Sequence, residues 1–248
     1  MYQNVTDHVD YGGLKGESLD GYIRRESDET AFIIDRIKPG QVVVDIGANI
    51  GFYTLLLAKL AATGRVYAFE PGRLSFSLLT INTLLNGYEN VELVNQGVTS
   101  STGTAFYYSG GTVESGSTVA LEQPVFDHTR HRVAVPTVAL DDYFRDRHAK
   151  VDYIKIDIEG GEFEALKGMT QLLENNPQIW LTVEFAPYLP LWANVDIKEF
   201  LDFVRGLGFQ LYDVSRQSDV PATDEYLLRE YPKTRTGRYC NLMLERPK

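Results

Sequence analysis

The chain has 248 residues, of which 44% are hydrophobic and 23% charged, so it can bury the core of one large α/β domain. The formal net charge of −10 at pH 7 disfavours a nucleic-acid partner, because phosphate binding needs a basic surface. Neither a run of roughly 20 apolar residues that would span a membrane nor a signal peptide is recognisable, and the single Cys240 cannot form an internal disulfide, so a cytoplasmic protein is expected.

Short strands and helices alternate along the first hundred residues. A polar arm precedes a helix over 20–37, in which Phe32, Ile33 and Ile37 share one face. The pattern then predicts, in this order, a strand over 41–46, a helix over 52–62, a strand over 65–70, a helix over 73–87 and a strand over 91–95. This order at short spacing is typical of a doubly wound α/β sheet.

Residues 99–132 break this rhythm. They are rich in Ser, Thr and Gly, and we interpret them as an insertion over the sheet, with a hairpin around TAFYYSGG. Regular structure returns with the segment 132–144. It continues with a strand over 151–157, a helix over 162–174, a strand over 178–185 and a helix over 196–208, and it ends with an antiparallel pair of strands over 209–215 and 238–246. We therefore expect an α/β fold with a doubly wound, mostly parallel, seven-stranded sheet, helices on both faces and an antiparallel C-terminal strand.

Acidic residues stand at the carboxyl ends of several predicted strands. Asp45, Glu70 and Glu184 each end one strand, and Asp157 and Glu159 end another. Open parallel sheets bind ligands beyond these strand ends, near the point where the strand order reverses. One such acid is explained as a cap, but a series predicts a binding site.

The turn after the first strand narrows the choice of ligand. VVVDIGANIG (42–51) has the pattern D-x-G-x-N-x-G, which lacks the third glycine of a dinucleotide fingerprint and places Asp45 where a pyrophosphate would be repelled. A cationic ligand without phosphates fits better. Glu70, about 25 residues later, can accept hydrogen bonds from both hydroxyls of a ribose. These features favour S-adenosylmethionine (SAM).

Four motifs together resemble the FkbM family of class I SAM-dependent methyltransferases. They occur in that family's order and spacing: VVVDIGANIGFYT (42–54), YAFEPG (67–72), VALDD (138–142) and DYIKIDIEGGEFEALKG (152–168), followed by VEF (183–185). The resemblance covers about residues 26–186. It implies a Rossmann-like fold and O-methylation of a hydroxyl on a small molecule, natural product or glycan. It also implies a SAM-binding domain over 39–248, with the arm and helix of 1–38 covering the site.

The resemblance also implies roles for individual residues. Those under the methionine part of the cofactor would be Asp45, Gly47, Asn49 and Gly51. Glu70 would bind the ribose, Gln96 and Gly97 would contact adenine, and Asp157 would lie where the methyl group meets the acceptor. The segment around Glu29 and Thr30 matches the family's first helix.

The acceptor side leaves several alternatives open. Lys155 shares a strand face with Asp157, either as part of the acceptor site or as a structural ion pair below it. Carboxylates of Asp157 and Glu184 would suit a hard cation such as Mg²⁺ (magnesium) or would bind cofactor and amides instead. Candidate bases are Asp157, Glu184, His128 and His131. Tyr188, Leu191 and Trp192 either line the acceptor pocket or pack in an ordinary loop.

Three other functions compete with this interpretation. A nicotinamide-dependent (NAD(P)) oxidoreductase would bind phosphates at Gly47–Gly51, which Asp45 disfavours. A SAM-dependent enzyme catalysing a non-methyl transfer is not excluded. A scaffold without turnover would not need polar groups at the strand ends.

Three tyrosines near the C-terminus are compatible with a homodimer surface: Tyr226, Tyr231 and Tyr239.

Overall fold

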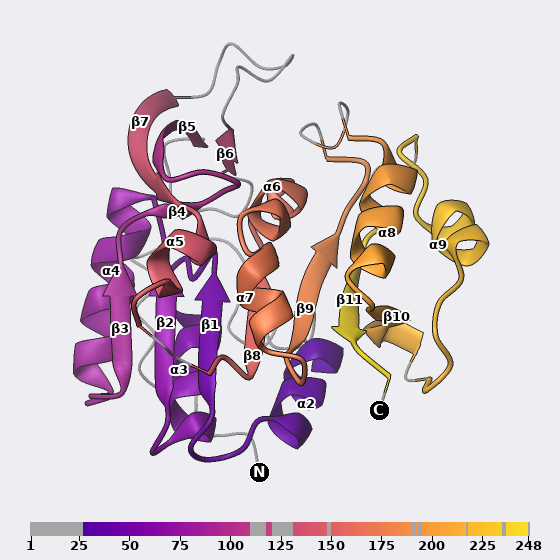
Figure 1. Cartoon of the computed structure of the whole chain (residues 1–248). Coiled ribbons are helices and arrows are strands. Elements are labelled where there is room, and N and C mark those ends of the chain that lie inside the picture. The colour runs from indigo at the N-terminus through magenta and orange to yellow at the C-terminus, as the bar shows by residue number, and fades with distance from the viewer. Residues whose placement is uncertain are drawn as a thin grey trace.

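The main sheet has the predicted architecture. The computed structural model describes residues 27–109, 118–120, 131–147, 150–189, 192, 195–216, 218–234 and 237–247. Seven strands form the main sheet in the order β10-β11-β9-β8-β1-β2-β3 (Figure 1). Their bounds are β1 Val42–Ile46, β2 Arg65–Phe69, β3 Val91–Val94, β8 Tyr153–Ile156, β9 Trp180–Phe185, β10 Gln210–Asp213 and β11 Cys240–Glu245. Strand β11 runs antiparallel to both of its neighbours, whereas β1, β2, β3, β8 and β9 are parallel.

Helices cover both faces of this sheet, as expected (Figure 1). Their bounds are α2 Ser27–Arg36, α3 Phe52–Ala61, α4 Arg73–Leu85, α5 Leu140–Phe144, α6 Glu162–Lys167, α7 Thr170–Asn175, α8 Ile197–Gly206 and α9 Asp224–Glu230, with a 3₁₀ turn over Val214–Arg216. In the described part of the chain, no helix is long and apolar enough to span a bilayer.

Side-chain alternation in β1 decides which face each site residue occupies. Val43 belongs to the same buried cluster as Leu57 of α3, whereas Val44 belongs to a different cluster, which contains Leu201 of α8. Because successive strand residues point to opposite faces, Asp45 lies on the same face as Val43, next to α3. The register pairs Asp45 with Lys155 of β8. A row of polar side chains is thereby built into the face that α2 and α3 cover.

The expected insertion contains a second sheet. Its order is β4-β7-β5-β6, and its bounds are β4 Gly97–Val98, β5 Gly103–Ser109, β6 Thr118–Ala120 and β7 His131–Val138. Strand β5 pairs antiparallel with both β6 and β7. The sheet lies beyond the carboxyl ends of β1 and β2 (Figure 1). It therefore includes strands on both sides of the range 99–132, for which the sequence predicted only a hairpin around TAFYYSGG. Strand β5 lies in that segment and pairs antiparallel with β6.

Two predicted helices differ in detail from the structure. The helix expected over 162–174 is divided into α6 and α7 at Gly168 and Met169, where the Gly168 carbonyl accepts a hydrogen bond from the Asp141 amide at 2.9 Å. Helix α2 begins at Ser27 in the described chain, so the predicted arm lies outside the described residues. The boundary near residue 38 remains a prediction.

Candidate functional site

The site lies where the strand order reverses. From β1 the chain continues to β2 on one side, and β8 joins β1 on the other. The carboxyl ends of β1 and β8 therefore diverge into loops that leave on opposite sides, which is the usual ligand position in this architecture. Asp45 and the turn after it come from β1, and Asp157 follows β8. The structure thus brings together residues that are more than a hundred positions apart.

Asp45 and Gly47 form the base of the site. The Asp45 carboxylate is buried and accepts a hydrogen bond from the Thr54 hydroxyl at 2.6 Å. Burial raises the pKa of Asp45, although Lys155 and Thr54 oppose the shift. Gly47 has φ 85°, and a Cβ atom there would lie 1.9 Å from the Asp157 carbonyl oxygen. Only glycine fits between these two strand ends.

Glu70 is fixed by the turn that follows β1. Its two carboxylate oxygens accept hydrogen bonds from the Asn49 amide at 2.9 Å and the Gly72 amide at 2.7 Å. Asn49 and Gly51 both have positive φ, which orients the Asn49 amide toward the end of β2. Burial raises the pKa of Glu70 to about 7, against the effect of these two bonds. A carboxylate has about four acceptor positions, so two remain for ligand hydroxyls.

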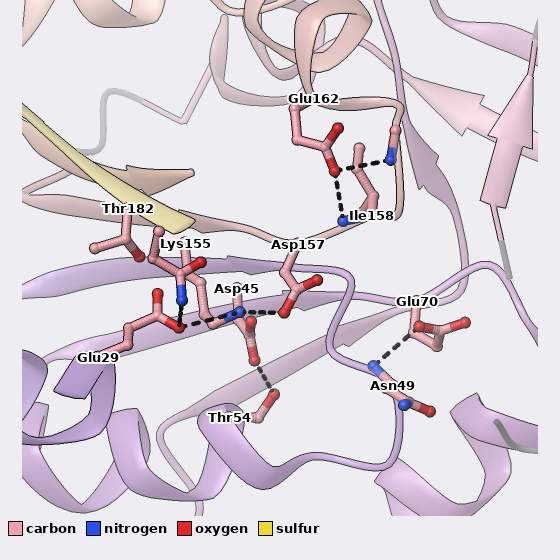
Figure 2. A network of polar contacts seen from close by, with 12 residues as sticks. Glu29, Asp45, Asn49, Thr54, Glu70, Lys155, Asp157, Ile158, Glu162 and Thr182 are labelled. Atoms are coloured by element: carbon pink, nitrogen blue, oxygen red, sulfur yellow. Dashed lines mark hydrogen bonds and ion pairs between the residues drawn. The ribbon is translucent and has the colours of Figure 1, made fainter. Parts of the chain in front are cut away.

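Lys155 is the centre of a buried charge network (Figure 2). Its ammonium donates a hydrogen bond to Asp157 at 2.8 Å, lies 4.0 Å from Glu29 of α2, and stands 4.2 Å from the ring centroid of Tyr53. Burial alone would lower the pKa of Lys155, but the carboxylates of Asp157, Glu29 and Asp45 outweigh it and raise the pKa well above its usual value. One ammonium thus serves three carboxylates.

Further hydrogen bonds tie this network to neighbouring elements. The Asn241 amide of β11 donates to Glu29 at 3.1 Å. Thr182 lies beside Lys155 in the register of β8 and β9, and its hydroxyl is 2.6 Å from the Tyr153 hydroxyl. The structure therefore gives Lys155 the properties of a structural ion pair and also places it in direct contact with Asp157. Both interpretations of the sequence are compatible with this geometry.

Glu184 has the least satisfied carboxyl group of the site. The register of β8 and β9 places it next to Asp157. Its buried Oε2 atom has no hydrogen-bond partner among the described residues. Burial raises the pKa of Glu184 well above the usual value, and the carboxylates of Asp157, Glu162 and Glu159 add to the shift.

Glu162 is a site residue that the sequence interpretation missed. Its Oε1 atom accepts hydrogen bonds from the amides of Ile158 and Gly160, each at 3.1 Å, and its Oε2 atom accepts one from the Trp192 indole at 3.2 Å. Burial raises the pKa of Glu162 to about 7. These bonds shape the loop after β8. In the sequence, Glu162 resembles an ordinary acid in the first turn of a helix; the preceding glycine pair was the available signal.

The remaining predicted residues fall in different places. Gln96 follows β3, and Gly97 lies in β4, paired with Thr137. Trp192 is fully buried and packs against Phe185 and Phe200, in agreement with the packing alternative. His128 and Leu191 lie outside the described residues, and only the backbone of His131 is described, in β7.

Two further predictions, the magnesium site and the homodimer surface, can be compared with the described residues. No group of three or more His, Cys, Asp or Glu side chains in the described chain is arranged to hold a metal ion. The ammonium of Lys155 occupies one carboxylate oxygen of Asp157, so Asp157 and Glu184 do not by themselves make up the ligand set of a resident divalent cation. Tyr226 and Tyr231 both donate hydrogen bonds to Asp213, at 2.8 and 2.6 Å. The dimer surface remains a prediction.

Comparison with known proteins is consistent with this geometry. The hexuronic acid methyltransferase AglP of Haloferax volcanii is 26% identical over 161 residues, 62% of this chain and 60% of that protein. Methyltransferase sdnD of Sordaria araneosa is 27% identical over 156 residues, 52% of this chain and 60% of that protein. The chain thus spans about three fifths of the length of these curated relatives.

The fold comparison and the family comparison agree. A protein from Streptococcus mutans, solved in complex with SAH, superimposes with a TM-score of 0.50 at 11% identity, over 88% of this chain and 96% of that one. At this identity the likeness concerns the fold alone. The Methyltransferase FkbM domain matches residues 45–211, which include the turn after β1, Glu70, Asp157 and Glu184. The chain therefore belongs to the FkbM methyltransferase family.

Proposed function

We propose that the protein is a SAM-dependent methyltransferase that methylates a hydroxyl group of a small molecule, natural product or glycan. The observation that carries the proposal is Glu70, which two backbone amides hold at the carboxyl end of β2 with two acceptor positions left over. This arrangement matches the two adjacent hydroxyls of a ribose. Membership of the FkbM family and the name of AglP, a hexuronic acid methyltransferase, support a hydroxyl on a sugar-like acceptor.

We assign the site residues to two groups, one that would bind the cofactor and one that would bind the acceptor. Glu70 would bind the ribose, the turn from Asp45 to Gly51 (with Gly47 and Asn49) would hold the methionine part, and Gln96 with Gly97 would contact adenine. Bound SAM would supply an electrophilic methyl group for the acceptor oxygen and would leave as S-adenosylhomocysteine. The backbone turn excludes side chains from this space because Gly47 lies against Asp157.

Asp157 and Glu184 would handle the acceptor hydroxyl. Lys155 orients the Asp157 carboxylate, which can then accept the hydroxyl hydrogen bond. Glu184, once ionised, would take the hydroxyl proton, since its raised pKa makes it a stronger base than an ordinary carboxylate. No step requires a metal ion.

Thermal unfolding with ligands tests the cofactor. The protein would be heated with SAM, S-adenosylhomocysteine, NAD, NADP or ATP, each with and without magnesium. A ligand at 100 times its Kd stabilises the folded state by about 2.7 kcal/mol, so a shift with SAM and S-adenosylhomocysteine alone is expected. A shift with NAD or NADP instead would contradict the proposal. Magnesium dependence of the shift would restore the metal prediction for Asp157 and Glu184.

Turnover tests the acceptor side. With an acceptor in hand, Asp157→Asn should lower kcat by about a hundredfold and leave the SAM affinity within about threefold of wild type. S-adenosylhomocysteine release measures the first quantity and calorimetry the second. Exposed Glu199 provides the control variant Glu199→Gln, which should change neither. A fully active Asp157→Asn protein would show that the acceptor site is wrongly assigned.

A further inference from the structure

The second sheet reaches into the cofactor half of the site at Gly72. A Cβ atom built on Gly72 would lie 2.6 Å from the Tyr107 hydroxyl and 2.8 Å from the Glu70 Oε1 atom. These two oxygens therefore converge on the same side of Gly72. Tyr107 belongs to β5 and Glu70 follows β2, so a side chain of the second sheet approaches the same point as the carboxylate at the carboxyl end of β2.

Strand β6 makes a second approach of the same kind. A Cβ atom on Gly97 would lie 3.1 Å from the Val119 side chain, and one on Gly161 would lie 3.7 Å from the Val119 carbonyl oxygen. Gly97 itself belongs to β4, so the first of these approaches lies within the second sheet, whereas the second joins that sheet to the main domain just before α6. Figure 1 shows the second sheet above the carboxyl ends of the parallel strands. The second sheet therefore covers the end of the site at which we propose that the nucleoside binds.

We infer that Tyr107 is a cofactor-binding residue, whose phenol closes the ribose end of the pocket and binds the ribose hydroxyls together with Glu70. This inference rests on the proposed function. A phenol both donates and accepts a hydrogen bond, so it can accept from one ribose hydroxyl or donate to it while Glu70 accepts from the other. Gly72 is then required for two reasons: its amide holds Glu70, and its missing side chain leaves room for the Tyr107 hydroxyl.

The neighbouring Tyr108 offers a matched control. Side chains alternate along β5, so Tyr108 points to the opposite face from Tyr107. The Tyr108 hydroxyl is buried and has no hydrogen-bond partner among the described residues. Tyr108→Phe therefore removes the same atom from the next residue of the same strand, away from Glu70.

Calorimetric titration with S-adenosylhomocysteine gives the first test. Tyr107→Phe should raise the Kd roughly threefold to tenfold, the range for one lost hydrogen bond, whereas Tyr108→Phe should leave it unchanged. S-adenosylhomocysteine that lacks its 2′ or 3′ ribose hydroxyl should bind the wild-type protein more weakly than the complete ligand does. For Tyr107→Phe, one of these two analogues should bind as tightly as the complete ligand, because the hydroxyl that it lacks is the one that Tyr107 would contact. Equal Kd values for the two phenylalanine variants would overturn the inference. Absence of wild-type binding would overturn the proposed function and the ribose role with it.

A double-variant cycle tests the placement of Tyr107 without any ligand. Gly72→Ala should lower the unfolding midpoint, because its methyl group meets the Tyr107 hydroxyl. Tyr107→Phe should remove part of that loss in the combined variant, and Tyr108→Phe should remove none. Additive effects of Gly72→Ala and Tyr107→Phe would show that the two residues are not in contact and would overturn the inference, even in a protein that binds SAM normally.

Discussion

The two halves of the site treat their buried carboxyl groups differently. Glu70, on the β2 side, is held by two backbone amides, and burial raises its pKa to about 7. Glu184, on the β9 side, has a buried oxygen without a hydrogen-bond partner among the described residues, and three neighbouring acids raise its pKa further. The first group is organised before a ligand arrives, which suits the ribose binding that we propose for Glu70. The second is surrounded by other acids, which suits the proton acceptor that we propose for Glu184.

Lys155 lies between these halves, and its removal should have the largest effect. Lys155→Met leaves the buried carboxylates of Glu29 and Asp45, and the partly exposed carboxylate of Asp157, without their shared ammonium. Breaking a buried ion pair in this way typically destabilises a protein by about 3–5 kcal/mol, so the free energy of unfolding in urea should fall by that amount. If charge is the cause, adding Glu29→Gln should recover part of the loss.

An exposed lysine gives the control for this measurement. Lys198 forms an ion pair with Asp202 on α8, and the two side chains are 69% and 58% exposed. Lys198→Met should leave the free energy of unfolding nearly unchanged, because an exposed ion pair is screened by solvent. Equal stability of the Lys155→Met and Lys198→Met proteins would mean that the network around Lys155 contributes little to folding.

The same contrast explains how much the sequence revealed. Asp45, Glu70 and Asp157 were identifiable because each directly ends a short apolar run, which is a local pattern. The pairing of Glu29 with Lys155 joins residues 126 positions apart through the docking of α2, and no local pattern encodes it. Of the second sheet, the sequence indicated only a hairpin around TAFYYSGG, because β5 (Gly103–Ser109) pairs with β7 (His131–Val138) across a long interval in the sequence. Tyr107 therefore carried no sequence signal for a role beside Glu70.

Glu70 makes cofactor affinity depend on pH. Ribose hydroxyls donate to the ionised carboxylate, so binding should lower the pKa of Glu70 from about 7. Above pH 7 the group is already ionised and the Kd should be flat. Below it, binding must release a proton, and the Kd should rise by up to about tenfold per pH unit. Titration with S-adenosylhomocysteine in buffers of different ionisation enthalpy measures both the Kd and the proton.

Two glutamine variants separate Glu70 from its neighbours in this test. Glu70→Gln should bind more weakly at pH 8 and lose the pH dependence. Glu162→Gln removes the other carboxyl group whose pKa is raised to about 7, and its Kd should keep the wild-type dependence. A pH-independent wild-type Kd would show that the ionised carboxylate does not bind the ligand.

Glu184 should have the smallest effect on the free protein, and the sign of its pH dependence is fixed. The pKa of Glu184 is higher in the folded state than in the unfolded chain, so the folded state binds more protons between the two pKa values. The free energy of unfolding contributed by Glu184 is therefore fully present below the pKa of the unfolded chain and is lost progressively as pH rises from that value through the higher pKa of the folded state. Glu184→Gln, which resembles the protonated acid, should change stability by about 1 kcal/mol or less at pH 5 and become relatively more stable toward pH 8. Urea unfolding at both pH values measures this, and a parallel pH dependence in the two proteins would mean that Glu184 ionises freely and is solvated like an ordinary surface acid.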